Sequence, residues 1–589
     1  KIANNEDFNI NSVSVGKGAN SVAGNTVLGE SALDASVSGG GNTAIGKEAL
    51  TSHTSGTNNT AVGQIAAFSN TTGNNLTAIG RGAAYANTSG IENTAIGTGA
   101  LFYNTTGDNN VAVGRLALTA NTTADNNTAV GKSSLAANTT GAENVAVGSK
   151  TLDANTTGES NVAVGYVALG ANTTGGNNVA VGRVSLDANT TGQKNTALGN
   201  GTLSTSTTGD QNTALGFESL ALSTTADNNT GVGYYALRSN TTGTNNVAVG
   251  IQALALNTTA DNNTALGRVC LYDNTTGEKN TAVGSGVLAN NTTASNNTAL
   301  GFEALTQNTT GNQNTCLGAN ASDTSTTASD NVIVGYYAGK ALTSGSHNVG
   351  IGSQAFDVNT TGSYNVAVGK HSLGANTTAN NNVAVGYESL NAVTTGEQNV
   401  AVGAYSNDTN STGNHNISVG YQSLFSNTAS NNTALGHVAM YANTTGTSNV
   451  AVGYAALDAN TTGASNTAVG SSTLRANTTG YENAAFGKSA GNALTTGARN
   501  TCIATTAPVS TGNYNLLLGF NAGEAASPSG QVNTGSGNVV LGDNNIGNLF
   551  CADTSISSSD SRDKTDVASF NIGLAWIEAL RPVTYRWDR

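Results

Sequence analysis

The sequence predicts an all-β protein, a parallel β-solenoid (β-roll) built from coils of seventeen residues. Two observations predict this fold. A glycine recurs every seventeen residues from Gly29 to Gly420, and short aliphatic clusters keep fixed positions between these glycines. Self-similarity of this kind is typical of stacked identical units and not of a globule. The clusters are too short for helices, and the glycine, asparagine and threonine of each unit oppose them. We therefore expect one elongated rod.

One clean unit runs from Gly114 to Val130 and has the sequence GRLALTANTTADNNTAV. Counted from the glycine, it has a small residue at position 4, leucine at 5, Asn-Thr-Thr at 8–10, glycine or alanine at 11, asparagine at 14, and Thr/Val, Ala and a branched aliphatic residue at 15–17. We expect two short strands per coil, one in the Asn-Thr-Ala-Val cluster and one in the Ala-Leu cluster, joined by tight turns. Roughly thirty coils spaced about 4.8 Å apart would make a shaft on the order of 145 Å long.

The two faces of the strand at positions 14–17 receive different side chains. Alternation sends positions 15 and 17 to one face and 14 and 16 to the other. We expect the aliphatic residue at 17 to point into the coil and the alanine at 16 to pack against a neighbouring chain. The asparagines at 8 and 14 repeat in register and can form hydrogen-bonded ladders. The apolar surface buried in one such coil is small compared with the conformational entropy lost when seventeen residues are ordered. We therefore predict a homotrimer, intertwined or side by side; a monomeric solenoid is the alternative.

The period divides the chain into four regions. Residues 1–25 are an irregular lead-in that caps the N-terminal end, and residues 26–503 are the shaft. Residues 504–556 are irregular terminal coils and a neck, as expected where a solenoid ends. Residues 557–589 contain both tryptophans and an amphipathic run. We therefore expect a short helix-containing segment there.

Charge and hydropathy exclude several classes of function. The net charge is −13 and the 22 lysines and arginines do not cluster, so we expect no nucleic-acid partner. No apolar run is long enough for a membrane span. The acidic residues form no repeated ligand set, so we expect no metal and no other cofactor. The Asn-Thr-Thr and Asn-Asn-Thr triplets are formal glycosylation acceptors, but we interpret them as turn and ladder residues.

Four cysteines, Cys270, Cys316, Cys502 and Cys551, lie far apart in the sequence. Their spacing matches neither a zinc site nor a redox motif. Cys270 occupies repeat position 4, and Cys316 and Cys502 occupy position 16. We therefore interpret these three as small buried hydrophobic residues.

Position 2 of the unit varies freely, so we expect its side chains to be exposed. It carries aromatic residues in several coils, among them Tyr234, Tyr336, Tyr387, Tyr421 and Tyr454. Rings about 10 Å apart along one ridge could stack on sugars. The alternative is that they shield strand edges or pack on a neighbouring chain. No paired carboxylates are discernible for cleaving a glycan, so we do not expect the shaft to be an enzyme.

Two stretches of the chain resemble known families. The strand motif, as in residues 161–165 (NVAVG) and 93–97 (NTAIG), resembles the head repeats of trimeric autotransporter adhesins, which are trimeric left-handed parallel β-rolls. Residues 557–589 resemble the start of the intramolecular chaperone domain of endosialidases and other phage tail spikes and fibres. That match is carried by Ser559, Asp560, Arg562, Lys564, Leu580, Arg581, Pro582, Val583, Tyr585 and Trp587.

The second resemblance implies a self-cleaving assembly domain. In that family the domain trimerises, helps the fibre ahead of it to fold, and then cuts itself off. By position, Ser559 would be the nucleophile, Lys564 its general base, and Ser559-Asp560 the scissile bond.

Together the two resemblances imply a phage tail fibre or spike on the virion tail, outside the cell. Its partners would be its own copies and a host cell-surface glycan or envelope component. The alternative is a bacterial cell-surface adhesin or extracellular filament built on the same trimeric β-roll.

Overall fold

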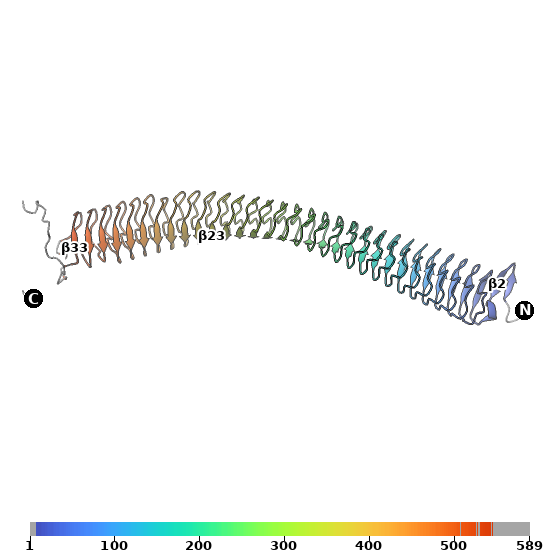
Figure 1. Ribbon diagram of the computed structural model, residues 1–589. Helices are drawn as coiled ribbons and strands as arrows, with labels where there is room; N and C mark the ends of the chain where they lie inside the picture. Colours follow the sequence, from blue (N-terminus) through green and yellow to red (C-terminus); the bar gives the residue numbers. More distant parts are fainter. Residues whose placement is uncertain (1–6, 507, 526, 528–529, 544, 546–589) are drawn as a thin grey trace, which may run out of the picture.

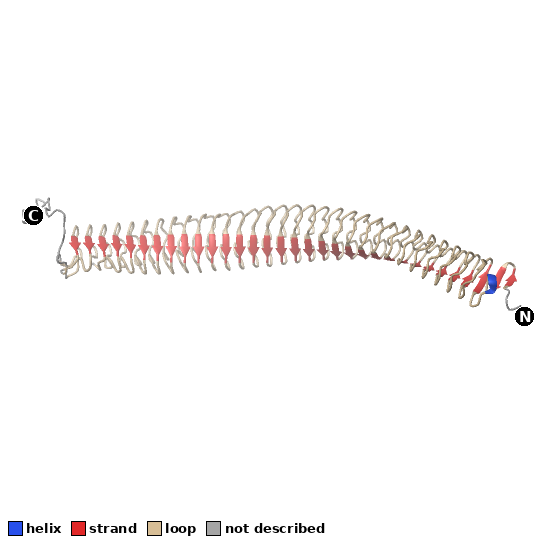
Figure 2. Ribbon diagram, turned by 60° about the horizontal axis from the view of Figure 1, so that its bottom comes forward, coloured by secondary structure: helices blue, strands red, loops and turns tan. Residues whose placement is uncertain are grey.

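The computed structural model describes residues 7–506, 508–525, 527, 530–543 and 545. These residues form one gently curved rod, with the N-terminal coils at one end and the last coils at the other (Figure 1). The strands lie side by side in a single row along one face of the rod, and turns make up the rest of each coil (Figure 2). The predicted parallel β-solenoid of seventeen-residue coils is therefore confirmed.

Each regular coil contributes one strand of three residues, at repeat positions 15–17. Consecutive strands from β3 onward pair in parallel, and alanine faces alanine at the middle of most pairs, as in Ala146 and Ala163. The strands are β1 (Phe8–Ile10), β2 (Val13–Gly16), β3 (Thr26–Gly29), β4 (Thr43–Ile45), β5 (Thr60–Val62), β6 (Thr77–Ile79), β7 (Thr94–Ile96), β8 (Val111–Val113), β9 (Thr128–Val130), β10 (Val145–Val147), β11 (Val162–Val164), β12 (Val179–Val181), β13 (Thr196–Leu198), β14 (Thr213–Leu215), β15 (Thr230–Val232), β16 (Val247–Val249), β17 (Thr264–Leu266), β18 (Thr281–Val283), β19 (Thr298–Leu300), β20 (Thr315–Leu317), β21 (Val332–Val334), β22 (Val349–Ile351), β23 (Val366–Val368), β24 (Val383–Val385), β25 (Val400–Val402), β26 (Ile417–Val419), β27 (Thr433–Leu435), β28 (Val450–Val452), β29 (Thr467–Val469), β30 (Ala484–Phe486), β31 (Thr501–Ile503), β32 (Leu516–Leu518) and β33 (Val539–Leu541).

The pairing at the N-terminal end of the row is antiparallel, because β2 runs opposite to both of its neighbours. β1 and β2 form an antiparallel hairpin, and β2 pairs antiparallel with β3. A short 3-10 turn, η1 (Ala19–Ser21), follows the hairpin. The Asp7 carboxylate accepts the backbone N–H groups of Lys17 at 2.5 Å and Gly18 at 2.8 Å. These two bonds tie the start of β1 to the loop that follows β2.

The expected second strand, in the Ala-Leu cluster, does not form. Positions 3 and 5 adopt left-handed backbone conformations, with φ of 57° at Leu116 and 52° at Leu118. Left-handed residues at alternate positions curl the chain and interrupt an extended run. The segment still bonds to the next coil, because the N–H of Leu118 donates to the carbonyl of Ser134 at 2.8 Å. The coil therefore has one strand and a hydrogen-bonded curled wall opposite it.

The prediction that position 17 points into the coil and position 16 points outward was wrong, because the two faces are reversed. The alanines at position 16, such as Ala112 and Ala129, are fully buried inside the coil, and Leu198 at position 17 is 44% exposed. The alternation itself holds. The interior already contains the leucine at position 5 and a small residue at 4. Ser134, at position 4, donates its hydroxyl to the carbonyl of Ala146 at 2.9 Å. In most coils this close approach of wall to strand leaves room only for alanine.

The asparagine ladders are confirmed in both columns. At position 14, the Asn161 side-chain amide donates to the Asn144 amide oxygen at 3.1 Å and to the Gly175 carbonyl at 2.9 Å. At position 8, Asn155 donates to the Asn138 amide oxygen at 2.8 Å. Both columns are buried. They satisfy polar groups that no water reaches.

The buried cysteines behave as expected. Cys270, Cys316 and Cys502 are free and lie in the core, and Cys551 lies outside the described residues. Burial raises the pKa of the Cys270 thiol to about 11 and the pKa of Cys316 and Cys502 to about 12. Thiols held in this way are poor nucleophiles. The three residues serve as small core side chains.

The marker glycines form a column in which no side chain fits. Gly250 has a φ of 137°, and a Cβ built on it would lie 2.2 Å from the carbonyl oxygen of Gly267 in the next coil. The backbones of the two coils are in direct contact at this corner, so neither coil can shift to make room for a side chain. The seventeen-residue recurrence of glycine therefore follows from the turn that ends each strand.

Replacing one marker glycine should open the shaft locally. We expect Gly250→Ala to cost more than about 2 kcal/mol, because the methyl group adds strain and a backbone clash. Hydrogen exchange of residues 233–267 would measure the local opening. The matched control is Gly201→Ala, whose Cβ would meet only the flexible Glu218 side chain, at 3.2 Å. Equal hydrogen-exchange protection of residues 233–267 in the two variants would contradict the conclusion that the marker glycines are required for close contact between coils.

One position of the asparagine ladder holds a histidine. His53 is fully buried at position 8. Its Nε2–H donates to the Gly56 carbonyl at 2.8 Å, and its Nδ1 accepts the Asn70 amide at 3.2 Å. Both ring nitrogens are engaged, and a proton on Nδ1 would oppose the Asn70 donor. Burial lowers the pKa of the His53 imidazole below its ordinary value of 6.5.

This histidine should make the N-terminal coils sensitive to acid. Because the folded chain holds His53 neutral, its stabilisation is present above about pH 6.5 and is lost as the pH falls below that value. We expect the hydrogen-exchange protection factors of residues 42–70, corrected for the intrinsic exchange rate at each pH, to fall between pH 7 and pH 5. His53→Asn restores the usual ladder residue and should remove this loss of protection. An unchanged pH profile in the variant would contradict the prediction.

Candidate functional site

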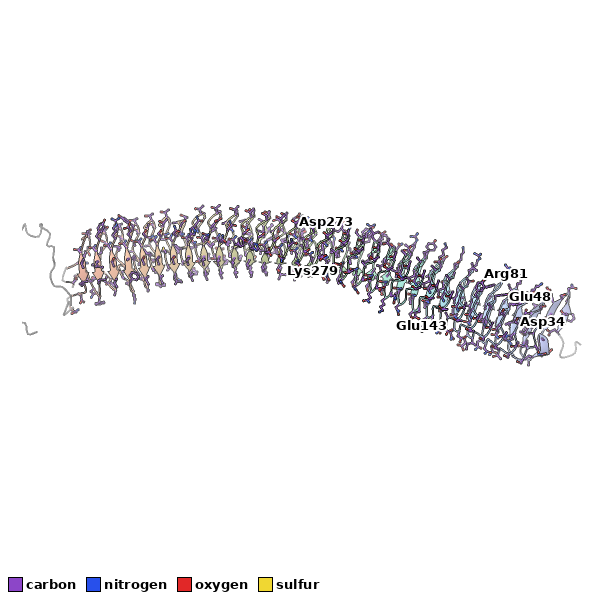
Figure 3. All side chains as sticks on the ribbon, viewed as in Figure 1. Asp34, Glu48, Arg81, Glu143, Asp273 and Lys279 are labelled. Atoms are coloured by element: carbon purple, nitrogen blue, oxygen red, sulfur yellow. The ribbon has the colours of Figure 1, made fainter. Side chains whose placement is uncertain are left out.

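The variable position 2 points outward, as predicted. The five predicted tyrosines are all exposed: Tyr234, Tyr336, Tyr387, Tyr421 and Tyr454. Charged side chains also line the outside of the rod, with Arg81 and Asp273 along its upper edge and Glu143 and Lys279 along its lower edge (Figure 3). Coils therefore differ from one another on the wall formed by positions 2–7 and also at position 13, which carries Glu143 and Lys279.

Three of the predicted tyrosines belong to one continuous aromatic surface. Tyr421, His437 and Tyr454 stack in consecutive coils, with ring centroids 5.2 Å and 5.6 Å apart. Tyr405 joins Tyr387 to Tyr421 through edge contacts with centroids 5.3 Å and 6.2 Å apart. We call this surface the 387–454 ridge. Its members are Tyr387, Tyr405, Tyr421, Phe425, His437, Tyr441 and Tyr454.

Sequence reasoning missed four members of the ridge. His437 shares position 2 with the predicted tyrosines, Tyr405 stands at position 3, and Phe425 and Tyr441 stand at position 6. Phe425 and Tyr441 stack with centroids 5.2 Å apart. The signal was present in the sequence, because positions 2, 3 and 6 belong to one wall. It becomes visible only when these columns are read together across coils.

Tyr234 lies in a separate cluster. It stacks on Phe217 with centroids 5.7 Å apart and contacts Tyr235 with centroids 4.0 Å apart. The Arg238 guanidinium lies over the Tyr235 ring, 4.8 Å from its centroid, and forms an ion pair with Glu218 at 2.9 Å. Charged side chains therefore hold one side of this cluster in place.

Tyr336 belongs to a third, smaller cluster. Its ring lies 4.1 Å, centroid to centroid, from that of Tyr337. The Lys340 ammonium group lies over the Tyr337 ring, 4.3 Å from its centroid. The five predicted tyrosines thus occupy three surfaces and do not form one ladder.

The N-terminal part of the 387–454 ridge is acidic. A hydrogen bond with Glu388 raises the pKa of the Tyr387 hydroxyl to about 12. Burial raises the pKa of Asp408 to about 6, and the nearby charge of Glu388 adds to the effect. The ridge therefore combines aromatic faces with carboxylates, an arrangement that favours neutral or cationic ligands over anions.

Ser559, Lys564 and the Ser559-Asp560 bond lie outside the described residues. Within the described ranges, no helix is long and apolar enough to cross a membrane. In the same part of the chain, no three His, Cys, Asp or Glu side chains are grouped to hold a metal ion.

No protein-family model matches this chain, and no curated protein matches its sequence.

Proposed function

We propose that the chain is the shaft of an extracellular fibre that associates with its own copies and attaches to a host-cell surface. The observation that carries this proposal is a continuous apolar band on the strand face. The band consists of the outward side chains at positions 15 and 17 of strands β4 to β33, which are mostly threonine or valine at 15 and mostly valine, isoleucine or leucine at 17. Leu198, Leu300 and Leu435 are 44%, 48% and 46% exposed.

The size of the band argues for a partner. Thirty strands spaced about 4.8 Å apart, with two outward residues about 7 Å apart, give an area on the order of 1,000 Å². Contiguous apolar patches on monomers rarely exceed about 600 Å². Stable protein interfaces bury about 800 Å² on each partner. A band of this size is large enough to form a stable interface.

A second copy of the same chain fits the band best. Only a surface with the same spacing between coils can match it along its whole length. The apolar surface also continues onto the N-terminal hairpin, where Phe8 and Val15 are exposed, and Val15 pairs beside Leu28. We infer three copies, as in the trimeric adhesin heads that the strand motif resembles. The valine, isoleucine and leucine of the band, and not the alanine of position 16, would then form the interface.

Attachment would use the other outward wall. The aromatic clusters at positions 2, 3 and 6 can stack on sugar rings, and many weak contacts along three chains would add through avidity. We favour a phage tail fibre or spike, because residues 557–589 resemble a self-cleaving fibre chaperone. The alternative is a bacterial surface adhesin or filament built on the same shaft.

Charging the band should prevent association. We expect Leu198→Lys combined with Leu215→Lys to turn a species of three times the chain mass into a monomer, because lysines would be buried in an apolar contact. Sedimentation velocity would measure the mass. The control is Gln211→Lys with Asn228→Lys, which adds the same charge at exposed positions outside the band. Loss of association in the control, or its persistence in the leucine variant, would reject the band as the interface.

Self-cleavage tests the choice between the two kinds of fibre. We expect the complete reading frame to yield a shaft fragment ending at Ser559, and Ser559→Ala to stay whole and still assemble, because it lacks the nucleophilic hydroxyl. Intact mass spectrometry would identify both products. If the unmodified chain also stays whole, the self-cleaving chaperone is wrong, and the adhesin or filament becomes the better assignment.

A further inference from the structure

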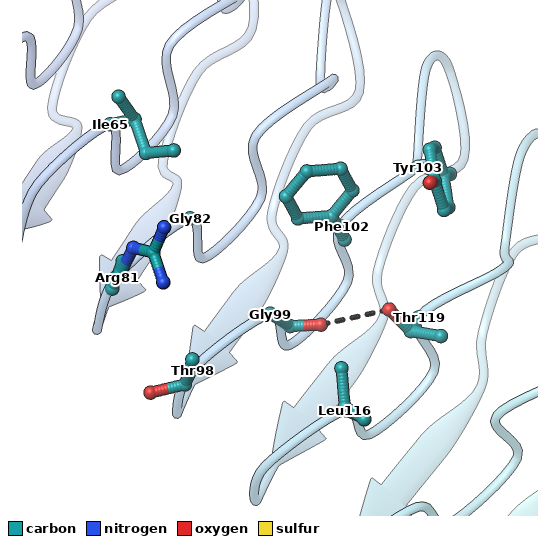
Figure 4. A pocket seen from close by; sticks show the side chains of 9 residues that line it. All are labelled: Ile65, Arg81, Gly82, Thr98, Gly99, Phe102, Tyr103, Leu116 and Thr119. Carbon is teal, nitrogen blue, oxygen red and sulfur yellow. Dashed lines mark hydrogen bonds between the residues drawn. The ribbon is translucent and has the colours of Figure 1, made fainter.

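The described part of the shaft contains a hollow near its N-terminal end that belongs to none of the three aromatic clusters above. Its volume is about 450 Å³, and it lies over Gly82 and Gly99. Ile65 and Arg81 border it on one side, and Phe102 and Leu116 border it on the other (Figure 4). Ligand pockets in proteins typically have volumes of roughly 300–1,000 Å³, so the hollow is large enough for a sugar ring.

Two missing side chains create the hollow. Position 3 carries isoleucine at Ile65 and leucine at Leu116, but glycine in the two coils between them. A Cβ on Gly82 would lie 3.1 Å from the Phe102 ring, and a Cβ on Gly99 would lie 3.0 Å from Leu116 Cδ2. Any side chain at these two positions would enter the space. The hollow is therefore a local departure from the repeat, set by two consecutive residues of one column.

The aromatic wall of the hollow is held in place by its neighbours. Phe68, Tyr85 and Phe102 stack in consecutive coils, with centroids 5.2 Å and 4.8 Å apart and nearly parallel rings. Tyr103 packs edge-on against Phe102, with centroids 4.8 Å apart. A ring fixed on two sides loses little entropy when a ligand stacks on it.

The polar groups of the hollow include one available cation. Arg81 is exposed at the rim and, in the described part of the chain, forms no ion pair. Thr98 is also exposed there, and Thr119 donates its hydroxyl to the Gly99 carbonyl at 3.0 Å, which fixes the floor. A guanidinium that has no protein carboxylate can bind one from a ligand with two parallel hydrogen bonds.

We propose that this hollow binds an acidic pyranose, a sugar ring that carries a carboxylate, from a surface polysaccharide. The Phe102 ring and the Ile65 and Leu116 side chains would contact the C–H faces of the sugar, and Arg81 would bind its carboxylate. The inference rests on the proposed attachment to cell-surface glycans. It assigns acidic sugars to this hollow, in contrast to the acidic 387–454 ridge.

Filling the hollow gives the sharpest test. The variant is Gly82→Ser with Gly99→Ser, which other coils show to be compatible with the fold: Ser133 occupies the same position with a φ of 54°. The matched control is Gly201→Ser with Gly286→Ser. These two position-3 glycines have φ of 66° and 69°, and a Cβ on either would meet only a glutamate Cγ, at 3.2 Å.

The probes are tri-galacturonic acid and its methyl ester, titrated into the full chain by calorimetry. We expect the unmodified chain and the control to bind the acid at least tenfold more tightly than the ester. The filled variant should lose at least tenfold in affinity for the acid. Arg81→Gln should bind acid and ester alike, whereas Arg183→Gln, at position 2 of a distant coil, should leave the preference intact.

Unchanged binding in the filled variant, or no preference for the acid in the unmodified chain, would overturn the proposal. Binding that survives filling but is lost in Tyr421→Ala with Tyr454→Ala would place sugar recognition on the 387–454 ridge. The attachment function would then stand and the inference about the hollow would fail. Binding of neither sugar would count against the hollow and against glycan attachment, while sedimentation would still report self-association separately.

Discussion

The shaft depends on the hydrogen bonds of its two buried asparagine columns. A seventeen-residue coil encloses polar backbone groups that water cannot reach, and each one left unpaired would cost about 1–3 kcal/mol. The asparagine amides pair these groups within a coil and between coils. The coil that is one residue short keeps this pairing. Its deletion falls in the turn, where Asn427 donates to the Ala429 carbonyl at 2.9 Å, and Asn443 still donates to Asn427 at 2.7 Å.

Around the asparagine columns, the apolar core is only one side chain thick. Position 16 on the strand faces position 5 on the curled wall, and the two share one volume. Where Ile333 replaces the usual alanine, glycine replaces leucine at Gly339, and a Cβ there would lie 3.3 Å from Ile333. Leu517 and Gly523 repeat the exchange near the C-terminal end. Large residues at both positions would overfill the interior, so in these two pairs a large residue at position 16 of one unit is balanced by glycine at position 5 of the next.

Much of this fold could be predicted from the sequence. The period, the strand at positions 15–17 and the asparagine ladders all follow from residue spacing. The second strand was wrongly expected, because spacing does not reveal left-handed residues such as Leu116 and Leu118. The inward face was wrongly assigned because hydropathy favours valine over alanine for a core. The large Ile333 at position 16 occurs together with Gly339 at position 5. This pairing indicates that position 16 faces inward, since only facing positions compensate in size.

The candidate sites were harder to predict, because they combine columns from different coils. The exposure of position 2 followed from its variability. The 387–454 ridge also needs Tyr405 at position 3, and the hollow needs Gly82 and Gly99 at position 3 beside Phe102 at position 6. These residues become neighbours only on the folded wall. No single repeat position contains all the residues of either site.

A rod of near-identical coils can be specific only where its coils differ. The glycine corner tolerates little change, because it is fixed by backbone contact with the next coil. The asparagine columns and the core accept a few replacements, such as His53 and Leu342 at position 8. Most variation lies at the outward positions. On the strand face these positions carry mostly threonine and aliphatic residues along the length of the rod, which would suit a uniform interface. On the adjacent wall they alternate among aromatic, charged and missing side chains. Under the proposed function, assembly and recognition would use different positions of the same seventeen-residue unit and could therefore evolve separately.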